Sequence, residues 1–471
     1  MAVITQQPNE FNLAVGPNIW TLGSIGTANR FVLAVEINGQ LVTTLKQTPN
    51  PAEAGIFDVS QILQSYLSNP FIEATEKFAP TPGAGLRYRI RYGVEVGSTI
   101  TWNGYSNYKV VLNGYKDFND LNWDNYGFYI PFMEEAPCED PGNPYTSCPI
   151  SEVNFLTSYP ETIDTPGISG IPCQPVTAST DNTYNEWATL NFCSFHQTSW
   201  SSIDTYNRAP WAVIIRYYNA SNVNYYTNAY SLYDSNGYML RGNCNSPIGT
   251  ITNPYIVGTI GTGPRNLWEA GLFPTNVAQP VPAYYTVELW TKGCGTIVDC
   301  VDVSEIIDGA QNGGCLWAIH AYRVVEDCSK FEPVRLSFLN EFGGRDYFTF
   351  TKRNTYTENT ERNNYFRDAG TWSAGTYSIN SYERGTQTFN STVRSTMYVS
   401  TDWLSDDISY WLEKLYTSPD VKMWTGGANG EWIAVNITSS SYQQKNSVRD
   451  NKLFRHELTF DYSQPQKRQR G

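Results

Sequence analysis

The sequence predicts a mainly β, multi-domain protein of β-sandwich-like architecture, with two or three short helices and long ordered loops. Aromatic residues make up 14% of the chain, led by 33 Tyr, and aromatic side chains favour strands. Charged residues make up only 16%, well below the usual quarter of a globular chain. Short apolar-polar alternations separated by Asn-Gly and Gly-Gly pairs are typical of strands joined by hairpin turns.

Residues 1–130 are predicted to form an N-terminal β-sandwich-like domain with one short helix. Asn38-Gly39 separates the apolar segments 31–37 and 41–46, which favours a two-residue type I′ hairpin. Residues 86–96 alternate between apolar and mostly charged side chains, as a half-buried strand does. Two more turns are expected, at Asn103-Gly104 and Asn113-Gly114.

The helix of this domain is expected over residues 59–67. Asp58 precedes it and is a suitable N-cap residue. Apolar side chains then recur at helical spacing and predict the buried stripe, which consists of Ile62, Leu63, Tyr66 and Leu67.

Residues 131–280 are predicted to be a Pro/Thr/Asn-rich insertion or a middle β-domain. Loops are expected over 132–185 and 248–279, and long ordered loops are usually functional or wrap a neighbour. Strands are expected at 211–218 and 225–233, with a turn at Asn236-Gly237. The acidic loop 134–140 lacks the alternating Asp/Asn spacing of a calcium loop, although a structural ion there stays open.

Residues 281–471 are predicted to form a C-terminal β-domain with one helix at about 405–416. Ser405 is the expected cap, and the acidic residues after it suit the first turn. The buried stripe of the helix is expected to consist of Ile408, Trp411, Leu412 and Leu415. Gly343-Gly344 predicts a turn before an aromatic-rich strand. Strands are expected at 283–290, 316–325, 334–339, 421–424, 432–437 and 454–462.

The charge and the cysteines indicate the compartment in which the chain is made and the partners that it does not bind. The formal net charge is −13, which disfavours nucleic acid and anionic membranes. No signal peptide and no long apolar segment are visible, and nine cysteines without a C-x-x-C pair favour reduced thiols. We expect synthesis in the host cytoplasm, no membrane contact and no specific nucleic-acid binding. The basic end at Lys467, Arg468 and Arg470 is interpreted as a solvated tail.

The sequence offers little for catalysis, so we expect no enzyme, no catalytic residue, no cofactor and no metal. Hydrolase, nucleotide and zinc-protease motifs are absent from it. Cys193 and His196 have metal-like spacing without a second pair, and His320 lies in an apolar run. A glycosidase needs two carboxylates, but the acidic residues that come into question are better interpreted as turn or cap residues; they are Asp299, Asp302, Glu305, Asp402 and Asp406.

Three segments resemble one family. Residues 334–351, with Asn340, Gly343-Gly344 and Asp346 before an aromatic strand, are the first. The others are 49–60 and the unit from 403 to Tyr462. In these segments the chain resembles the tail ring or hub (connector) structural proteins of crAss-like and related Bacteroidetes-infecting bacteriophages. Residues 137–279 match no part of that pattern.

The resemblance implies a structural virion protein of the phage tail or neck. Such a protein forms a homo-oligomeric ring, collar or hub by symmetric self-assembly around the DNA channel, with phage neck and tail proteins on the portal and tail sides. We hypothesise that an acidic lumen would let DNA slide without sticking.

The alternative is a tail-tip or fibre-associated adsorption protein that binds a host surface glycan. It depends on exposed aromatic faces in the middle region, where many aromatic residues gather. They are Trp200, Trp211, Tyr217, Tyr218, Tyr225, Tyr226, Tyr230, Tyr233 and Tyr238.

Overall fold

The protein is mostly β in the computed structural model, with 59% of the described residues in strands and 7% in helices, which confirms the predicted fold class. The structure describes residues 1–9, 11–24, 29–72, 77–115, 123–124, 127–128, 155–177, 186–193, 210–232, 257–274, 281–292, 314–325, 330–383, 385–426, 430–439, 453–464 and 466–467. Each helix in these ranges is too short or too polar to span a lipid bilayer.

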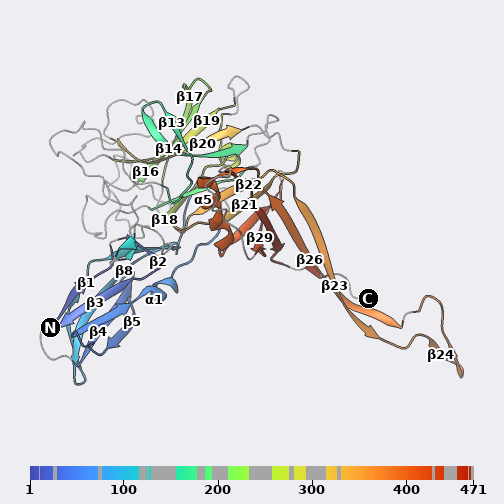
Figure 1. Cartoon of the computed structure of the whole chain (residues 1–471), viewed down its shortest axis with the longest axis horizontal. Coiled ribbons are helices and arrows are strands. Elements are labelled where there is room, and N and C mark those ends of the chain that lie inside the picture. Colours follow the sequence, from blue (N-terminus) through green and yellow to red (C-terminus); the bar gives the residue numbers. More distant parts are fainter. Residues whose placement is uncertain are drawn as a thin grey trace, which may run out of the picture. The chain divides into compact units, whose positions relative to one another are not determined.

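The chain divides into two compact units. Unit 1 comprises Met1–Asp327 together with Leu339–Asp346, and unit 2 comprises Cys328–Phe338 together with Tyr347–Gly471. The boundaries expected near residues 130 and 280 both lie inside unit 1. Each unit is described by itself below (Figure 1).

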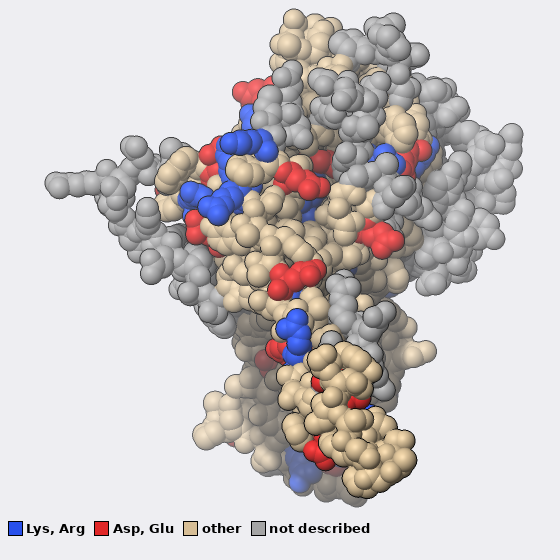
Figure 2. Space-filling view, turned by 90° about the vertical axis from the view of Figure 1, so that its right-hand side faces the viewer, with Lys and Arg blue, Asp and Glu red and all other residues tan. Residues whose placement is uncertain are grey.

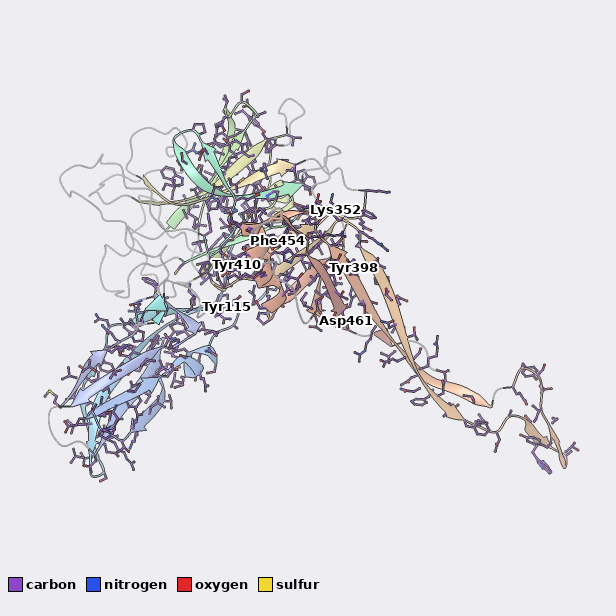
Figure 3. All side chains as sticks on the ribbon, viewed as in Figure 1. Tyr115, Lys352, Tyr398, Tyr410, Phe454 and Asp461 are labelled. Carbon is purple, nitrogen blue, oxygen red and sulfur yellow. The ribbon has the colours of Figure 1, made fainter. Side chains whose placement is uncertain are left out.

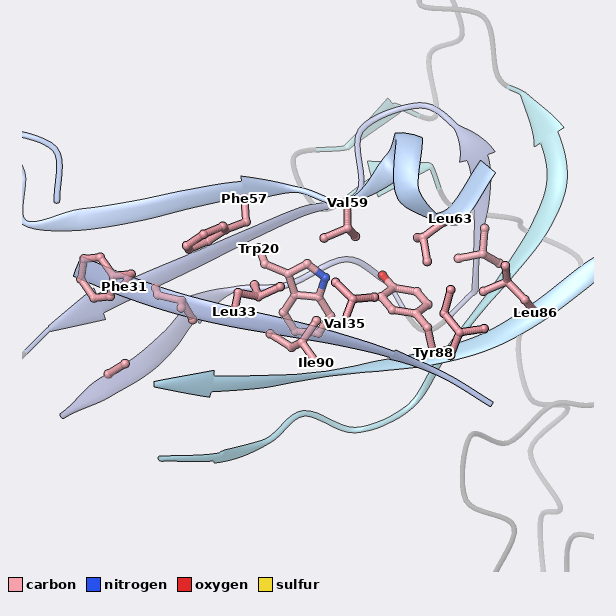
Figure 4. Packing of buried hydrophobic residues seen from close by; sticks show 14 of the residues in the cluster. Trp20, Phe31, Leu33, Val35, Phe57, Val59, Leu63, Leu86, Tyr88 and Ile90 are labelled. Atoms are coloured by element: carbon pink, nitrogen blue, oxygen red, sulfur yellow. The ribbon is translucent and has the colours of Figure 1, made fainter. Parts of the chain in front are cut away.

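The N-terminal part of unit 1 is a sandwich of two sheets. One sheet has the order β1-β3-β6, and the other has the order β2-β10-β8-β4-β5, with β9 beside β8. The elements are β1 (Ala2–Gln6), β2 (Phe11–Val15), β3 (Ile19–Ser24), β4 (Arg30–Ile37), β5 (Gln40–Gln47), β6 (Ala54–Asp58), α1 (Ser60–Gln64), β8 (Gly85–Val96), β9 (Thr99–Tyr105) and β10 (Lys109–Tyr115). Buried side chains from both sheets and α1, among them Trp20, Phe31 and Tyr88, form its core (Figure 4).

The first hairpin and the half-buried strand of this sandwich confirm the sequence patterns. Asn38 and Gly39 have φ angles of 50° and 80°, as a type I′ turn requires. Leu86, Tyr88 and Ile90 of β8 are buried. Arginines alternate with them and stack on aromatic rings, with Arg87 3.6 Å from the Tyr108 centroid, Arg89 4.1 Å from that of Tyr105 and Arg91 4.6 Å from that of Trp102.

The two other expected Asn-Gly turns are wrong. Asn103-Gly104 lies inside β9 and Asn113-Gly114 inside β10. The pairing register shifts at both places, between β9 and β8 and between β10 and β2. Each pair therefore accommodates an extra residue in a β-bulge, where glycine is also common.

The predicted cap of the first helix is also wrong. Asp58 ends β6, and α1 begins after Val59 without a side-chain cap. The Asp58 Oδ1 instead accepts hydrogen bonds from the backbone N–H of Ser60 (2.9 Å) and of Asn18 (3.3 Å). The helix ends at Gln64, so Tyr66 lies beyond it and is exposed, whereas Leu63 is buried as expected.

The rest of unit 1 is built on two further sheets. A six-stranded sheet has the order β13-β14-β20-β19-β16-β17, and a three-stranded sheet has the order β15-β18-β7. Strands from the expected middle and C-terminal regions thus alternate in one sheet. The elements are β7 (Phe78–Pro80), β11 (Trp123–Asp124), β12 (Gly127–Phe128), β13 (Thr162–Thr165), β14 (Ile168–Thr177), β15 (Thr189–Cys193), β16 (Pro210–Tyr218), β17 (Asn224–Ser231), β18 (Val257–Gly261), α3 (Pro264–Glu269), β19 (Tyr284–Lys292) and β20 (Gly314–Val325).

Two segments that were expected to be loops contain regular structure. β13 and β14 lie within 132–185, and β18 and α3 lie within 248–279. The sequence of these segments is rich in Pro and Gly, which are typical of loops, so the strands were not predicted. β14 contains two prolines yet pairs in parallel with β20 over five residues. Gly258 of β18 is needed for packing, because an added Cβ would clash with the Phe192 ring.

Unit 2 has one large sheet with a helix, and two small two-stranded sheets, β24-β25 and β27-β30. The order of the large sheet is β22-β21-β28-β29-β31-β26-β23, with β32 pairing with β26. The elements are β21 (Val334–Leu339), β22 (Arg345–Phe350), β23 (Thr355–Phe366), β24 (Thr371–Ser373), β25 (Thr376–Ser378), β26 (Thr386–Ser400), β27 (Leu404–Ser405), α5 (Asp406–Thr417), β28 (Val421–Trp424), β29 (Trp432–Ile437), β30 (Leu453–Phe454), β31 (Glu457–Tyr462) and β32 (Gln466–Lys467).

The helix of unit 2 confirms the prediction. Ser405 is its N-cap, and the Ser405 Oγ accepts a hydrogen bond from the Ile408 backbone N–H at 3.5 Å. All four residues of the expected stripe are buried. Trp411 packs against Phe338 of β21, with 5.5 Å between ring centroids, so the helix covers the sheet.

Candidate assembly surface

The most exposed element of unit 2 is a long hairpin, residues 355–400, which we call the arm. β23 and β26 pair antiparallel from Thr355↔Tyr398 to Phe366↔Thr386. Near its base, β26 also pairs with β31 and β32, as far as Thr392↔Lys467. Beyond Thr392 the arm is a ribbon of two strands, which Figure 1 shows continuing past the rest of the sheet.

Strand-forming residues build the arm, and hydrogen bonds between side chains hold its distal part. Thr, Asn, Ser and Tyr dominate residues 355–400, and the segment contains no proline. Asn363 Nδ2 donates to Asn390 Oδ1 (2.8 Å), and the Tyr365 hydroxyl donates to Gln387 Oε1 (2.6 Å). Thr388 Oγ1 donates to Asn364 (2.9 Å). These uncharged pairs span the ribbon where β31 and β32 no longer support it.

The base of the arm is tied to unit 2 by polar contacts. Thr396 Oγ1 donates to Asp461 Oδ1 of β31 at 2.6 Å. Lys352, which precedes β23, forms a 2.8 Å ion pair with Asp402, and this contact lowers the pKa of Asp402 below its usual value. Figure 3 labels Lys352, Tyr398 and Asp461 around this base. Asp402 thus has a structural partner.

Large apolar side chains are exposed at the distal end of the arm. Phe366 is 74%, Trp372 69% and Tyr382 79% exposed. Other exposed apolar residues of the same end, which we call the tip (366–389), are Tyr377, Ile379 and Phe389. Exposed apolar clusters of this kind mark interaction sites, and aromatic residues are enriched at protein interfaces.

A small second hairpin presents the tip residues. Trp372 of β24 lies directly opposite Tyr377 of β25. Ala374 and Gly375 form the turn with φ angles of 48° and 81°, as in a type I′ turn. The Tyr377 hydroxyl donates to the carbonyl of Ala369. The Tyr377 ring is therefore anchored at its hydroxyl, and Trp372, opposite it on β24, is exposed to solvent.

The arm carries balanced charge on a strongly acidic chain. Its four arginines, Arg362, Arg367, Arg384 and Arg394, equal its four acidic residues, Glu358, Glu361, Asp368 and Glu383. The whole chain has a net charge of −13. In Figure 2, which views the molecule from the arm's side, the protruding end is mostly tan. The tip can therefore approach an acidic partner without strong repulsion.

The two described histidines are structural. In the described part of the chain, neither ring nitrogen of His320 has a hydrogen-bond partner, and burial lowers its pKa to about 3. The ring packs against Phe155 and Tyr322. His456 Nε2 lies 2.7 Å from Ser409 Oγ, and burial lowers its pKa below the usual value.

The described residues contain no group of three or more His, Cys, Asp or Glu side chains placed to hold a metal ion. Cys193 is buried in β15, and His196, which stands at metal-like spacing from it in the sequence, lies outside the described residues. Cys173 is also buried, which raises the pKa of its thiol to about 11. Asp406 is in the first turn of α5, as predicted.

Several other sequence predictions lie outside the described residues. They are the acidic loop 134–140, the turn at Asn236-Gly237, the basic end at Arg468 and Arg470, the side chains of Lys467, Trp200, Trp211, Tyr233 and Tyr238, and the carboxylates of Asp299, Asp302 and Glu305.

Tyr217 and Tyr218 of the middle aromatic cluster pack inside unit 1, whereas Tyr225, Tyr226 and Tyr230 of β17 are half-buried. Tyr217 is fully buried, and its ring centroid lies 5.4 Å from that of Phe273 and 5.6 Å from that of Tyr285. Tyr218 stacks on Tyr284 at 4.6 Å. Among the described aromatic residues, those of the tip are more exposed than Tyr217 and Tyr218, and no sequence pattern pointed to them.

Comparisons with known proteins place the chain in no family. No family model matches it, and no curated protein does. One solved structure, entitled "The Bacillus anthracis TIE protein", aligns over 86% of this chain and 70% of its own, with 6% identity and a TM-score of 0.11. A likeness this weak carries no argument about fold or function.

Proposed function

We propose that the chain is a structural subunit of a bacteriophage virion, located in the tail or neck, where it forms a ring, collar or hub around the DNA channel. The observation that carries this proposal is the arm. A ribbon with an apolar, charge-balanced tip is suited to reach from one subunit to a neighbour, and repeated head-to-tail contacts of this kind close a ring. The resemblance of residues 334–351 to phage connector proteins supports the same assignment.

In an isolated monomer the arm would contribute little to stability. Two-stranded ribbons are marginally stable by themselves, and the tip exposes six large apolar side chains to water. Docking on another protein would bury these side chains and support the ribbon. An enzyme is not proposed, since none of the described residues suggests a catalytic constellation.

The proposal is tested first on purified phage particles. An antibody against the recombinant chain, read by immunogold electron microscopy, should label the neck or tail, and digested particles should yield peptides of the chain. Label confined to fibre tips would favour the adsorption alternative. Particles that lack its peptides would refute a virion role.

The tip is then tested directly. Trp372→Ala combined with Tyr382→Ala should leave far-UV circular dichroism unchanged, because both side chains are exposed, yet abolish incorporation into particles. The matched control is Tyr410→Ala, which removes an exposed ring of α5 in the same unit. Normal incorporation of the double variant would show that the tip is not needed for assembly and would contradict this part of the proposal.

One specific observation supports the glycan-binding alternative, which is that the rings of Trp372 and Tyr377 are exposed. Exposed aromatic faces can stack on sugar rings. On this alternative, a glycan array would detect binding that the Trp372→Ala variant loses, and particles would still assemble with that variant.

A further inference from the structure

The outer edge of β23 is an open strand edge. β23 is the last strand in the order of its sheet, and all of its residues, Thr355–Phe366, are exposed. The one register shift against β26, between Asn363 and Asn364, places the extra residue, Phe389, in β26. β23 itself is therefore regular. A long, regular, unpaired edge is a template for another strand.

We propose that this edge pairs antiparallel with β23 of a second copy of the chain, about a two-fold axis that passes at Thr360. The two arms would then form one four-stranded sheet in the order β26-β23-β23-β26. Such a contact is isologous, so it joins two subunits and no more. It goes beyond the proposed function, because a ring needs a different, head-to-tail contact.

Symmetry restricts the possible registers. Residues directly opposite each other on antiparallel strands point to the same face of the sheet. A two-fold axis relating the strands keeps each residue on its own face, so opposed residues must be an even number of positions apart. The axis must therefore pass at a residue. Thr360 stands at the middle of Thr355–Phe366, so a register centred there pairs nearly the whole strand.

Charge selects this register among its neighbours. With the axis at Thr360, Glu358 faces Arg362 of the second copy, and Arg362 faces Glu358 of that copy. An axis at Glu358, Glu361 or Arg362 would instead oppose two like charges, which destabilises a strand pair. An axis at Asn359 gives no ion pair. Among registers whose ion pairs lie within Thr355–Phe366, only the central one makes two ion pairs without placing like charges opposite each other.

The charges concerned are not neutralised across their own hairpin. Glu358 lies opposite Ser395 and Arg362 opposite Ser391 in the register with β26. Within the described residues neither forms an ion pair, although Glu358 Oε1 accepts a hydrogen bond from the Tyr356 hydroxyl at 2.9 Å. Arg394 lies opposite Asn359, on the other face of the ribbon. Both charges are therefore free to pair with a second copy.

The experiment is a charge swap in the full-length chain, with self-association measured by sedimentation equilibrium. Glu358→Arg places Arg opposite Arg twice and should raise the dimer dissociation constant about tenfold or more. Arg362→Glu should do the same. The double variant Glu358→Arg/Arg362→Glu restores opposite charges and should return the constant to within about threefold of the original.

A matched control lies on the same strand. Glu361→Arg changes the net charge equally, but in the proposed register residue 361 faces Asn359, so the dimer should be nearly unaffected. An unmodified chain that stays monomeric, a double variant that stays weak, or a control that weakens the dimer as much as Glu358→Arg would each overturn the proposal.

A cross-link gives the axis independently. Thr360→Cys brings two thiols to an opposed pair whose Cα atoms are about 4.5–5.5 Å apart, which a disulfide can span. Mild oxidation should link this variant into covalent dimers, whereas Asn363→Cys, opposite Thr357, should not link. Equal linking of both variants would contradict the register.

Discussion

His320 shows what burial does to a titratable side chain in this protein. It lies in β20 inside unit 1, fully buried among aromatic rings. The apolar residues around it in the sequence already predict a structural histidine. That reading needed only the local sequence. The loss of solvent that lowers its pKa to about 3 depends on the six-stranded sheet, whose strands lie far apart in the sequence.

This burial makes folding sensitive to acid. The folded state holds His320 neutral down to about pH 3, whereas the unfolded chain binds the proton near pH 6.5. Stability is therefore fully present above pH 6.5 and is lost progressively as the pH falls toward 3. At pH 5 the loss from this residue is about 2 kcal/mol.

The check is urea unfolding of the original chain and of His320→Leu at pH 7 and pH 5. The variant should lose about 2 kcal/mol less than the original chain on going from pH 7 to pH 5. The remaining dependence includes His456, whose pKa is also lowered. An equal loss in both proteins would show that His320 can be protonated in the folded state.

At the scale of single elements, the turn at Gly343-Gly344 explains why short motifs were predictable. Gly343 has a φ of +76°, and an added Cβ would clash with the Asn113 carbonyl oxygen. At Gly344 an added Cβ would clash with the Leu156 carbonyl oxygen. Asn340 closes the turn, because its Oδ1 accepts hydrogen bonds from the N–H groups of Phe342 and Gly344 at 3.0 and 2.9 Å.

Replacing both glycines with Val should therefore prevent folding of unit 1, to which Leu339–Asp346 belongs. Strain at positive φ and two backbone clashes together exceed the few kcal/mol that hold a domain. The control is Gly375→Ala, since its φ is also positive (+81°) but nothing lies within 4 Å of an added Cβ. Soluble expression and circular dichroism show whether each variant folds. A folded double variant would contradict the packing of this turn.

The arm was not predictable in the same way. Its strands bury few side chains, so they lack the apolar alternation on which strand prediction depends, and residues 355–400 received no strand in the sequence analysis. The many Thr and Tyr residues and the absence of proline in this segment were the signal that favours strands. By contrast, β21, β28 and β29 have the predicted bounds, and their apolar residues recur with the period of a strand. An exposed element such as the arm escapes prediction because exposure removes the pattern that a core imposes.

At the scale of the whole molecule, net charge is the property that the sequence determines most directly. The chain carries −13, and the described basic side chains on β8 are occupied by aromatic rings, as at Arg91 and Trp102, or by an acidic partner, as at Arg89 and Glu36 (2.8 Å). The role proposed above, a subunit around a DNA channel, requires that DNA pass without being retained. Like charge provides this, because binding to DNA depends on neutralising phosphates with Lys and Arg.

The purified chain should therefore not retain duplex DNA of random sequence in a filter assay at about 0.1 M salt, where charges still act over about 10 Å. Lowering the salt should not create binding, because repulsion between like charges grows as screening falls. A variant in which Glu358, Glu361 and Glu383 of the arm become Lys is the matched comparison, and it should gain salt-sensitive retention if the arm can reach DNA. Retention by the original chain that weakens steeply with salt would reveal a basic surface and would rule out an acidic, non-adhesive lumen.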